Sequence, residues 1–264
     1  MLVDEMPIAS FRTPPPRVAG AAHPRSPAAG GASHPSGGAP HAGAQVFNVR
    51  LAISAERHAA AGLLLQRMYA WRGYSVEAGI PNDGSSSADN KFTLYAETGG
   101  ELAGTVSLFL ERQGMLPADA HFGDRLALLR RQGRRLCEPS RLAIDKGMSK
   151  RVFAALMHIS HLYASRLRGC TDYVIEVNPR HVAFYRQALG FTELGAERHC
   201  ERVGAPAVLL HLPVERMSAQ IAQWGGSHDQ QRAERSFFPY FFPLRDEADI
   251  TARLAALCEP GGRE

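Results

Sequence analysis

The sequence predicts an α/β protein with a mixed central sheet and helices on both faces. Short runs in which apolar and polar residues alternate indicate strands, and longer segments with apolar residues every three or four positions indicate helices. Gly, Pro and Asn mark the boundaries between them. The elements follow the order strand, helix, hairpin, strand, helix, strand, helix, hairpin, which is typical of layered α/β folds.

The first half of the ordered chain is expected to form a strand, a helix and a hairpin. Residues 46–51 alternate as a strand, and Ser54 is placed to cap the helix that follows. A loop rich in Gly, Ser and Asp is expected over 81–90. Strands over 92–97 and 102–110 then meet at a Gly-Gly turn, which predicts a hairpin.

The second half is expected to alternate helices and strands before a closing strand pair. Asn178 and Pro179 are typical of a helix start, and Gly190 of a helix end. In order, the expected elements are a helix over 124–132, a strand over 137–145, a helix over 150–168, a strand over 173–177, a helix over 181–189, and strands over 193–202 and 207–212.

Composition divides the 264 residues into three parts. Residues 1–45 are dominated by Pro, Ala, Gly, Ser and His, so they bury too little apolar surface to offset the entropy of ordering, and we expect a disordered tail. Residues 46–213 form the expected globular domain. Residues 214–264 form an extension with two helices and an aromatic run at 237–242.

The overall composition favours a cytoplasmic protein and excludes several classes. A net charge of +4 does not imply nucleic-acid binding, and no apolar run is long enough to span a membrane. The four cysteines form no CxxC pair, which argues against a zinc ribbon or a disulfide scaffold. We expect no metal site: His158 and His161 share a helical face that should be solvated, and Cys137 should be a buried, inert thiol.

The strand at 137–145 contains an unusual pair of charged residues. Burying Glu138 and Arg141 costs several kcal/mol each, so a site or a structural ion pair should explain them. Pro139 donates no backbone hydrogen bond, which indicates an edge, a bulge or a place where two strands part. Parted strands would form a slot. Glu138 and Arg141 are three positions apart, so they share a face only if the strand is bulged.

Two motifs resemble a known superfamily. Asn-Pro-x-His-x-x-Phe-Tyr at 178–185, followed by Gly190 and Phe191, resembles the late strand-to-helix motif of the GNAT N-acetyltransferase superfamily. Glu-x-Ser-Arg-Leu-x-Ile-Asp at 138–145 resembles the Glu-x-x-Arg strand of acyl-homoserine-lactone synthases and long-chain N-acyl amino acid synthases. The resemblance covers about 46–212 and is strongest to the second group.

The resemblance implies an N-acyltransferase that moves a long-chain acyl group from an acyl carrier protein to the amine of an amino acid. The partners would be the carrier protein and the amino acid, and the co-substrate an acyl-phosphopantetheine, with no bound cofactor. Three alternatives stay open: a coenzyme A-dependent N-acetyltransferase, a lactone synthase, and a non-catalytic sensor of the same fold. Residues 145–151 lack the second glycine of the usual pyrophosphate loop, and Lys146, Lys150 and Arg151 suit a single phosphodiester instead.

The resemblance also implies roles for individual residues. Glu138 would take the proton of the amine, or form a structural pair with Arg141. Arg141 would orient Glu138 or bind the carboxylate of the amino acid. Tyr185 would protonate the leaving thiolate, or only pack. Substrate contacts are expected at Ser140 and Leu142, whose strand amides could hold the oxyanion, and at Asn178.

Two surfaces complete the expectations. The aromatic run at 237–242 either packs over the core or forms a lid over an acyl pocket that 207–212 would also line. Carrier proteins are acidic, so a basic docking face is expected. Its members would be Arg130, Arg131, Arg134, Arg135, Lys146, Lys150 and Arg151.

Overall fold

The computed structural model describes residues 7–13, 45–71, 90–111, 113–145, 148, 150–201, 204–229 and 234–258. The described strands form a nine-stranded sheet in the order β1-β2-β3-β4-β5-β6-β9-β7, with β8 also paired to β9. Their bounds are β1 (Ala9–Thr13), β2 (Gln45–Leu51), β3 (Lys91–Thr98), β4 (Glu101–Leu110), β5 (Leu136–Ile144), β6 (Asp172–Val177), β7 (Thr192–Glu193), β8 (Arg198–Cys200) and β9 (Ala205–Pro213).

The sheet is mixed, as the sequence predicts. Strands β5 and β6 run parallel, and the other described pairs are antiparallel. The predicted hairpin is confirmed, because Thr98 pairs with Glu101 across Gly99 and Gly100, both with positive φ. Only glycine adopts that backbone conformation without strain, so this turn requires its two glycines.

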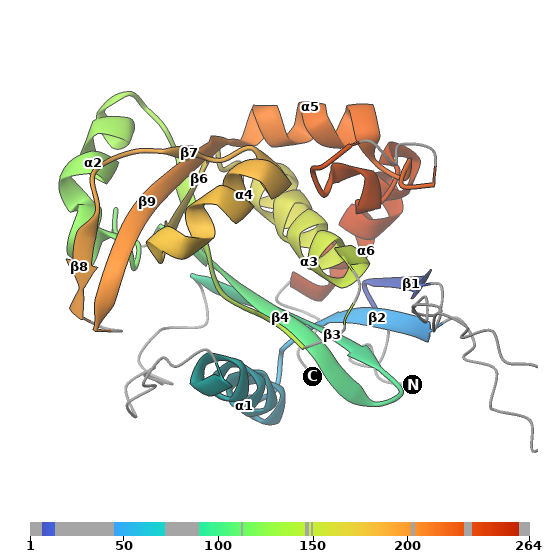
Figure 1. Cartoon of the computed structure of the whole chain (residues 1–264). Coiled ribbons are helices and arrows are strands. Elements are labelled where there is room, and N and C mark those ends of the chain that lie inside the picture. The colour runs from blue at the N-terminus through green and yellow to red at the C-terminus, as the bar shows by residue number, and fades with distance from the viewer. Residues whose placement is uncertain are drawn as a thin grey trace, which may run out of the picture.

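Helices cover both faces of the sheet (Figure 1). Helices α1 and α2 lie on one face, where α1 packs on Ala143 and α2 on Leu136. Helices α3 to α6 pack on the other face, around the largest apolar cluster. The bounds are α1 (Ala55–Trp71), α2 (Asp119–Arg131), α3 (Lys150–Leu162), α4 (Val182–Leu189), α5 (Val214–Trp224) and α6 (Glu247–Cys258), and α3 continues as a π-helical turn, Tyr163–Leu167.

Helix α2 begins five residues earlier than the sequence predicts. Gly123 interrupts the helical pattern, and Phe122 has a non-helical backbone (φ −128°), so the apolar spacing is regular only beyond it. The early start matters because it carries the amino end of α2 to β5. Ser54 caps α1 as expected, its hydroxyl accepting a hydrogen bond from the amide of Arg57.

The prediction of a wholly disordered tail is wrong for β1. Ala9–Thr13 pairs with β2, Ile8 is fully buried, and the ring of Phe11 stacks on Phe47 with centroids 5.5 Å apart. A short apolar segment inside a Pro/Gly-rich tail buries enough surface to add one strand to an open sheet edge. Residues 1–6 and 14–44 of the tail lie outside the described residues, as do 81–89 of the expected loop and Lys146.

The prediction that His158 and His161 are solvated is also wrong, because the C-terminal extension covers their face of α3. His158 lies 3.2 Å from a carboxylate oxygen of Glu247 on α6. His161 makes hydrogen bonds to the hydroxyls of Tyr173 and Ser218. Burial lowers the pKa of His161 to about 3. The sequence hides this cover because the partners come from residues far along the chain.

The aromatic run packs over the core, which is the first of the two interpretations. Phe238 and Phe241 are almost fully buried, and the ring of Phe237 meets Phe153 and Phe184 edge to face. Neither of the two cavities described below is lined by this run or by 207–212. No helix among the described residues is long and apolar enough to cross a bilayer.

Candidate active site

Strands β5 and β6 separate next to Pro139. They pair at Leu136 and Cys137, and the described pairing goes no further. Pro139 comes two residues after Cys137 and pairs only with Leu108 on the β4 side. Of the three alternatives that the sequence leaves open at Pro139, the structure shows a parting of strands. Backbone groups of β5 beyond Cys137 therefore face a gap in the sheet instead of a neighbouring ladder.

A narrow slot occupies this gap on the α3 face. Its volume is about 20 Å³, close to the space of one water molecule. The side chains around it are mostly apolar, and Tyr185 from α4 supplies a hydroxyl. The lining residues are Val106, Pro139, Leu142, Met157, Ile175, Tyr185 and Phe191. An extended chain that enters here would have to push the two strands further apart.

A bulge in β5 brings Glu138 and Arg141 to one face. Ser107 of β4 pairs with Ser140 and Thr105 with Ala143, so one residue on β4 stands opposite two on β5. Arg141 has a positive φ of 54°, a conformation that costs a non-glycine residue about 1–2 kcal/mol. The sequence makes a bulge the condition for a shared face, and the structure contains that bulge. A strained residue at such a place is typical of functional sites.

Phe109 shows that the two charged side chains share a face. It is the cross-strand partner of Glu138, and the guanidinium carbon of Arg141 lies 5.5 Å from its ring centroid. Glu138 is only 1% exposed, and its carboxylate accepts a hydrogen bond from the amide of Ala118, 2.8 Å away. Ala118 precedes the first turn of α2, where the helix dipole also favours a negative charge.

A second cavity, of about 260 Å³, lies on this face between α1 and the sheet. Its floor is polar, since Thr93, Thr105 and Ser107 point into it from β3 and β4, with Lys91 and Arg141 at its sides. Its helix wall is mostly apolar, with His58 and Gln66 as polar exceptions. Cations and hydroxyls against an apolar wall suit a small molecule that carries both a carboxylate and an apolar part.

Sequence reasoning missed this cavity floor. The residues carried a signal, because hydroxyl side chains at alternate positions of two predicted strands are unusual on a buried face. Thr93 and Ser107 hydrogen-bond each other at 2.9 Å, and Thr105 donates to the carbonyl of Leu94. Which face they occupy follows only from the register of the sheet.

Two of the other four predicted site residues on this side line the slot. Leu142 and Tyr185 line it, and the ring of Tyr185 packs edge to face on Phe184 and Phe191. Ser140 lies at the bulge, opposite Ser107. The Asn178 side chain accepts from the amide of Arg180 and donates to the carbonyl of Pro206. Asn178 therefore caps a turn and holds β6 to β9, and we leave it out of the proposed substrate contacts.

The predicted phosphate-binding cations have different surroundings. Lys150 is exposed at the amino end of α3, with its ammonium 5.0 Å from the ring centroid of Phe237. The Arg151 guanidinium donates to the carbonyl of Arg12 and lies against His228, so it joins β1 to the loop after α5. We therefore retain Lys150 alone as a candidate phosphate contact among the described residues.

The expected docking face divides into two separate regions. Arg130 makes a bidentate ion pair with Asp119, and Arg134 pairs with the buried Asp172. Arg131 and Arg135 are exposed, but they lie at the amino end of β5. A nine-residue strand spans roughly 30 Å, and Lys150 lies beyond its carboxyl end. The arginines before β5 therefore do not form one face with Lys150.

Cys137 is a buried, inert thiol, as predicted. It is fully buried in the main apolar cluster, and burial raises its pKa well above the usual value. Its sulfur lies 3.6 Å from the carbonyl oxygen of Asp172. A thiol that stays protonated at neutral pH is a poor nucleophile, so we leave Cys137 out of the candidate catalytic residues.

Parted parallel strands, a bulged Glu-x-x-Arg segment and a tyrosine in the slot define an acyltransferase with the N-acetyltransferase type of fold. Comparison with family models matches residues 60–213 to "N-acyl amino acid synthase FeeM". The match spans more than half of the chain, which therefore belongs to the FeeM family of N-acyl amino acid synthases.

Solved structures similar to this chain include a member of the same family. FeeM, an N-acyl amino acid synthase from uncultured soil microbes, is 26% identical with a TM-score of 0.59, over 66% of this chain and 94% of that one. A putative N-acetyltransferase from Lactobacillus plantarum is 18% identical (TM-score 0.46; 64% and 98% covered). The AHL synthase LasI is 17% identical (TM-score 0.45; 64% and 90% covered). A sequence comparison with curated proteins found no match.

Proposed function

We propose that this enzyme transfers a long-chain acyl group from the phosphopantetheine thioester of an acyl carrier protein to the amine of an amino acid. The observation that carries the proposal is the bulge at Arg141, which places a guanidinium in the 260 Å³ cavity on the same face as the buried Glu138. Membership in the N-acyl amino acid synthase family supports the reaction class. Carrier-protein thioesters are cytoplasmic metabolites, so we place the reaction in the cytoplasm.

The donor would enter through the gap between β5 and β6. The phosphopantetheine arm is extended and narrow, and the parted strands offer backbone groups along one side and apolar side chains along the other. Lys150, at the amino end of the 13-residue helix α3, would meet the phosphodiester, because a helix amino terminus favours an anion. The thioester carbonyl would then lie in the gap that joins the two faces.

The acceptor would lie on the other face, in the cavity beside α1. Arg141 would bind the carboxylate of the amino acid in its planar fork, and the hydroxyls of the floor would orient the molecule. The apolar wall contributed by α1 would take an apolar side chain. This arrangement directs the amine toward the gap, where β5 presents Glu138.

The proposed reaction forms one C–N bond and breaks one C–S bond. Glu138 first takes one proton from the ammonium group of the amino acid, directly or through a water. The neutral amine nitrogen then attacks the thioester carbonyl carbon, a C–N bond forms, and the nitrogen releases a second proton to solvent. Strand amides near Ser140 and Leu142 would stabilise the oxyanion. Collapse of the intermediate breaks the C–S bond, and Tyr185 or solvent protonates the thiolate that leaves.

Donor competition tests the proposal. The purified full-length chain is given a panel of amino acids with one of three donors: a long-chain acyl carrier protein, the coenzyme A thioester of the same acyl group, or acetyl-coenzyme A. Mass spectrometry should detect an N-acyl amino acid, formed fastest from the carrier-bound donor. Faster turnover of acetyl-coenzyme A would make the chain an N-acetyltransferase, and ligand-induced melting shifts without any product would make it a sensor.

A further inference from the structure

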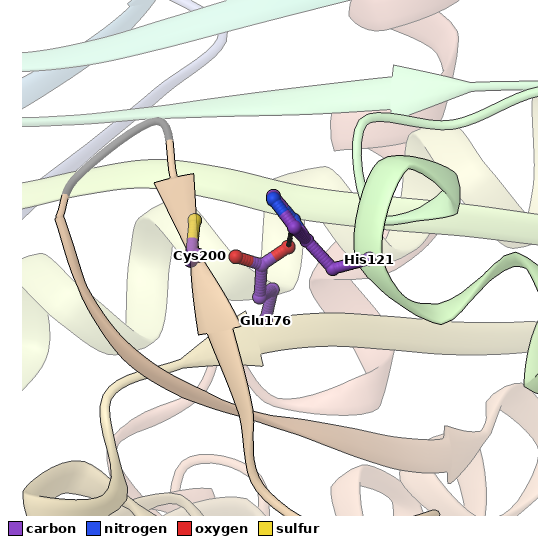
Figure 2. A group of neighbouring side chains, drawn as sticks. All are labelled: His121, Glu176 and Cys200. Atoms are coloured by element: carbon purple, nitrogen blue, oxygen red, sulfur yellow. Dashed lines mark hydrogen bonds and ion pairs between the residues drawn. The ribbon is translucent and has the colours of Figure 1, made fainter.

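Three side chains outside the proposed acyl-transfer machinery converge on one point. His121 comes from the first turns of α2, Glu176 from the carboxyl half of β6 and Cys200 from the end of β8, and Figure 2 shows the Glu176 carboxylate between the imidazole and the thiol. One potential ligand atom of each lies within 4.8 Å of the others. The His121 Nδ1 and Glu176 Oε2 atoms are already 3.2 Å apart.

The donor set and its spacing suit a zinc ion. Zinc binds imidazole nitrogen, carboxylate oxygen and thiolate sulfur at about 2.0–2.3 Å in tetrahedral geometry, so its ligands lie ~3.3–3.8 Å apart. The imidazole–carboxylate spacing of 3.2 Å lies just below this range, and the thiol needs a shift of about an ångström at most to reach it. Hard cations such as Mg²⁺ and Ca²⁺ prefer oxygen ligands only, which excludes them here.

The surrounding structure holds the three elements in place independently of any ion. The Arg198 guanidinium of β8 makes a bidentate ion pair with Asp124 of α2, and it also donates to the backbone carbonyl of His121 at 2.6 Å. Cys200 pairs with Ala205 in the sheet and is fully buried in the apolar cluster under α2. The side chain of Glu176 is only 4% exposed. Low mobility of this kind lowers the entropic cost of binding a metal.

We propose that His121, Glu176 and Cys200 form a zinc site, with solvent in the fourth position. The thiol binds as a thiolate, so one proton leaves to solvent for each ion bound. The ion would fix the amino end of α2 against β6 and β8. That end of α2 also carries the Ala118 amide that holds Glu138, so the zinc would have a positioning role and would touch no substrate. The ligands lie far apart in sequence, which is why local spacing did not reveal them.

Metal titration of the full-length chain tests the site. After chelator treatment, the protein should bind one Zn²⁺ that raises its melting temperature by roughly 5–10 °C at a hundredfold excess over Kd. Co²⁺ in place of zinc should give a thiolate charge-transfer band. The variants His121→Gln, Glu176→Gln and Cys200→Ser should each lose more than the ~10- to 100-fold in affinity that removal of an outer partner costs.

Matched controls separate this site from adventitious binding. His199 is exposed next to Cys200, and Cys258 is partly exposed on α6, so His199→Gln and Cys258→Ser should bind zinc like the wild type. Equal affinity in cluster and control variants would overturn the proposal, as would a wild-type Co²⁺ complex without thiolate absorption. The Co²⁺ spectrum is measured on the wild-type protein, so this test does not require any variant to fold.

Discussion

The carboxylate of Glu138 accepts a hydrogen bond from the backbone amide of Ala118, 2.8 Å away, although 20 residues separate them in the chain. This bond connects the amino end of α2 to the strand that carries the proposed base. A glutamine can accept the same bond with its carbonyl oxygen, so Glu138→Gln removes the charge and leaves the geometry intact.

Glu138→Gln should lower kcat by about 10²-fold or more and leave the KM of the acyl donor unchanged, because the amide cannot take the proton of the amine. Raising the pH should restore part of the rate, since a deprotonated amine needs no base. Steady-state kinetics across pH measures both effects. Glu247→Gln, at a buried carboxylate that lines neither cavity, is the matched control and should show no pH rescue. A stable variant with a normal rate at neutral pH would remove Glu138 from the mechanism.

Arg141→Lys should raise the KM of the amino acid by roughly 10- to 100-fold, because a lysine cannot bind a carboxylate bidentately. The chemical control is the amino acid amide, which lacks the carboxylate. The wild type should discriminate strongly against the amide, and the variant should discriminate little. Equal discrimination by both proteins would show that Arg141 does not bind the carboxylate.

Arg141→Gly should change the unfolding free energy by less than about 1 kcal/mol, since relief of the positive φ offsets the lost contact with Phe109.

Tyr185→Phe should lower kcat by less than about 10-fold. The leaving thiol has a pKa near 8.5 and departs tolerably as an anion, and phenylalanine preserves the packing on Phe184 and Phe191. Tyr163→Phe, stacked on Phe92 away from the slot, is the control. A loss of a hundredfold or more at unchanged KM would make the Tyr185 hydroxyl an essential acid.

Charge reversal at the carboxyl edge of the sheet should weaken binding of the carrier protein. Lys150 and Arg180 are exposed and follow the carboxyl ends of the parallel strands β5 and β6, so they lie at the same edge, where the donor would enter. Lys150→Glu with Arg180→Glu should raise the KM of the acyl carrier protein and reduce its salt dependence. Arg131→Glu with Arg135→Glu, at the other end of β5, should leave that KM unchanged. The reverse pattern would move the docking face to the amino end of β5.

Acidification should destabilise the fold through His161. Burial lowers its pKa from 6.5 to about 3, so the unfolded state takes up a proton first as the pH falls. The neutral, buried His161 makes its full contribution to the free energy of unfolding above pH ~6.5. Between pH ~6.5 and pH 3 the free energy of unfolding falls by up to about 1.4 kcal/mol per pH unit. The groups facing His161 are His158, Glu247, Arg166, Tyr173 and Ser218. The free energy of unfolding can be measured with urea at several pH values between 4 and 6.5. It should depend less steeply on pH for His161→Gln than for the wild type or for the exposed His199→Gln.

The sequence by itself determined the mixed α/β layout, the Gly-Gly hairpin, an interrupted ladder at Pro139 and the resemblance of 138–145 and 178–185 to N-acyl amino acid synthases. These features are local: each follows from alternation, from a missing amide hydrogen or from residues a few positions apart. Pro139 illustrates this, because a residue that cannot donate to a ladder restricts its strand wherever the strand lies.

The tertiary structure decided which of these residues meet. Only the register between β4 and β5 shows that Arg141 is the extra residue of the bulge and turns toward the face of Glu138. Only the fold of the C-terminal extension buries His161, and only the packing of α2 on β6 and β8 brings His121 and Cys200 to Glu176. Such contacts join residues far apart in the chain, and their free energy comes from surfaces that each element buries against another, so no local pattern encodes them.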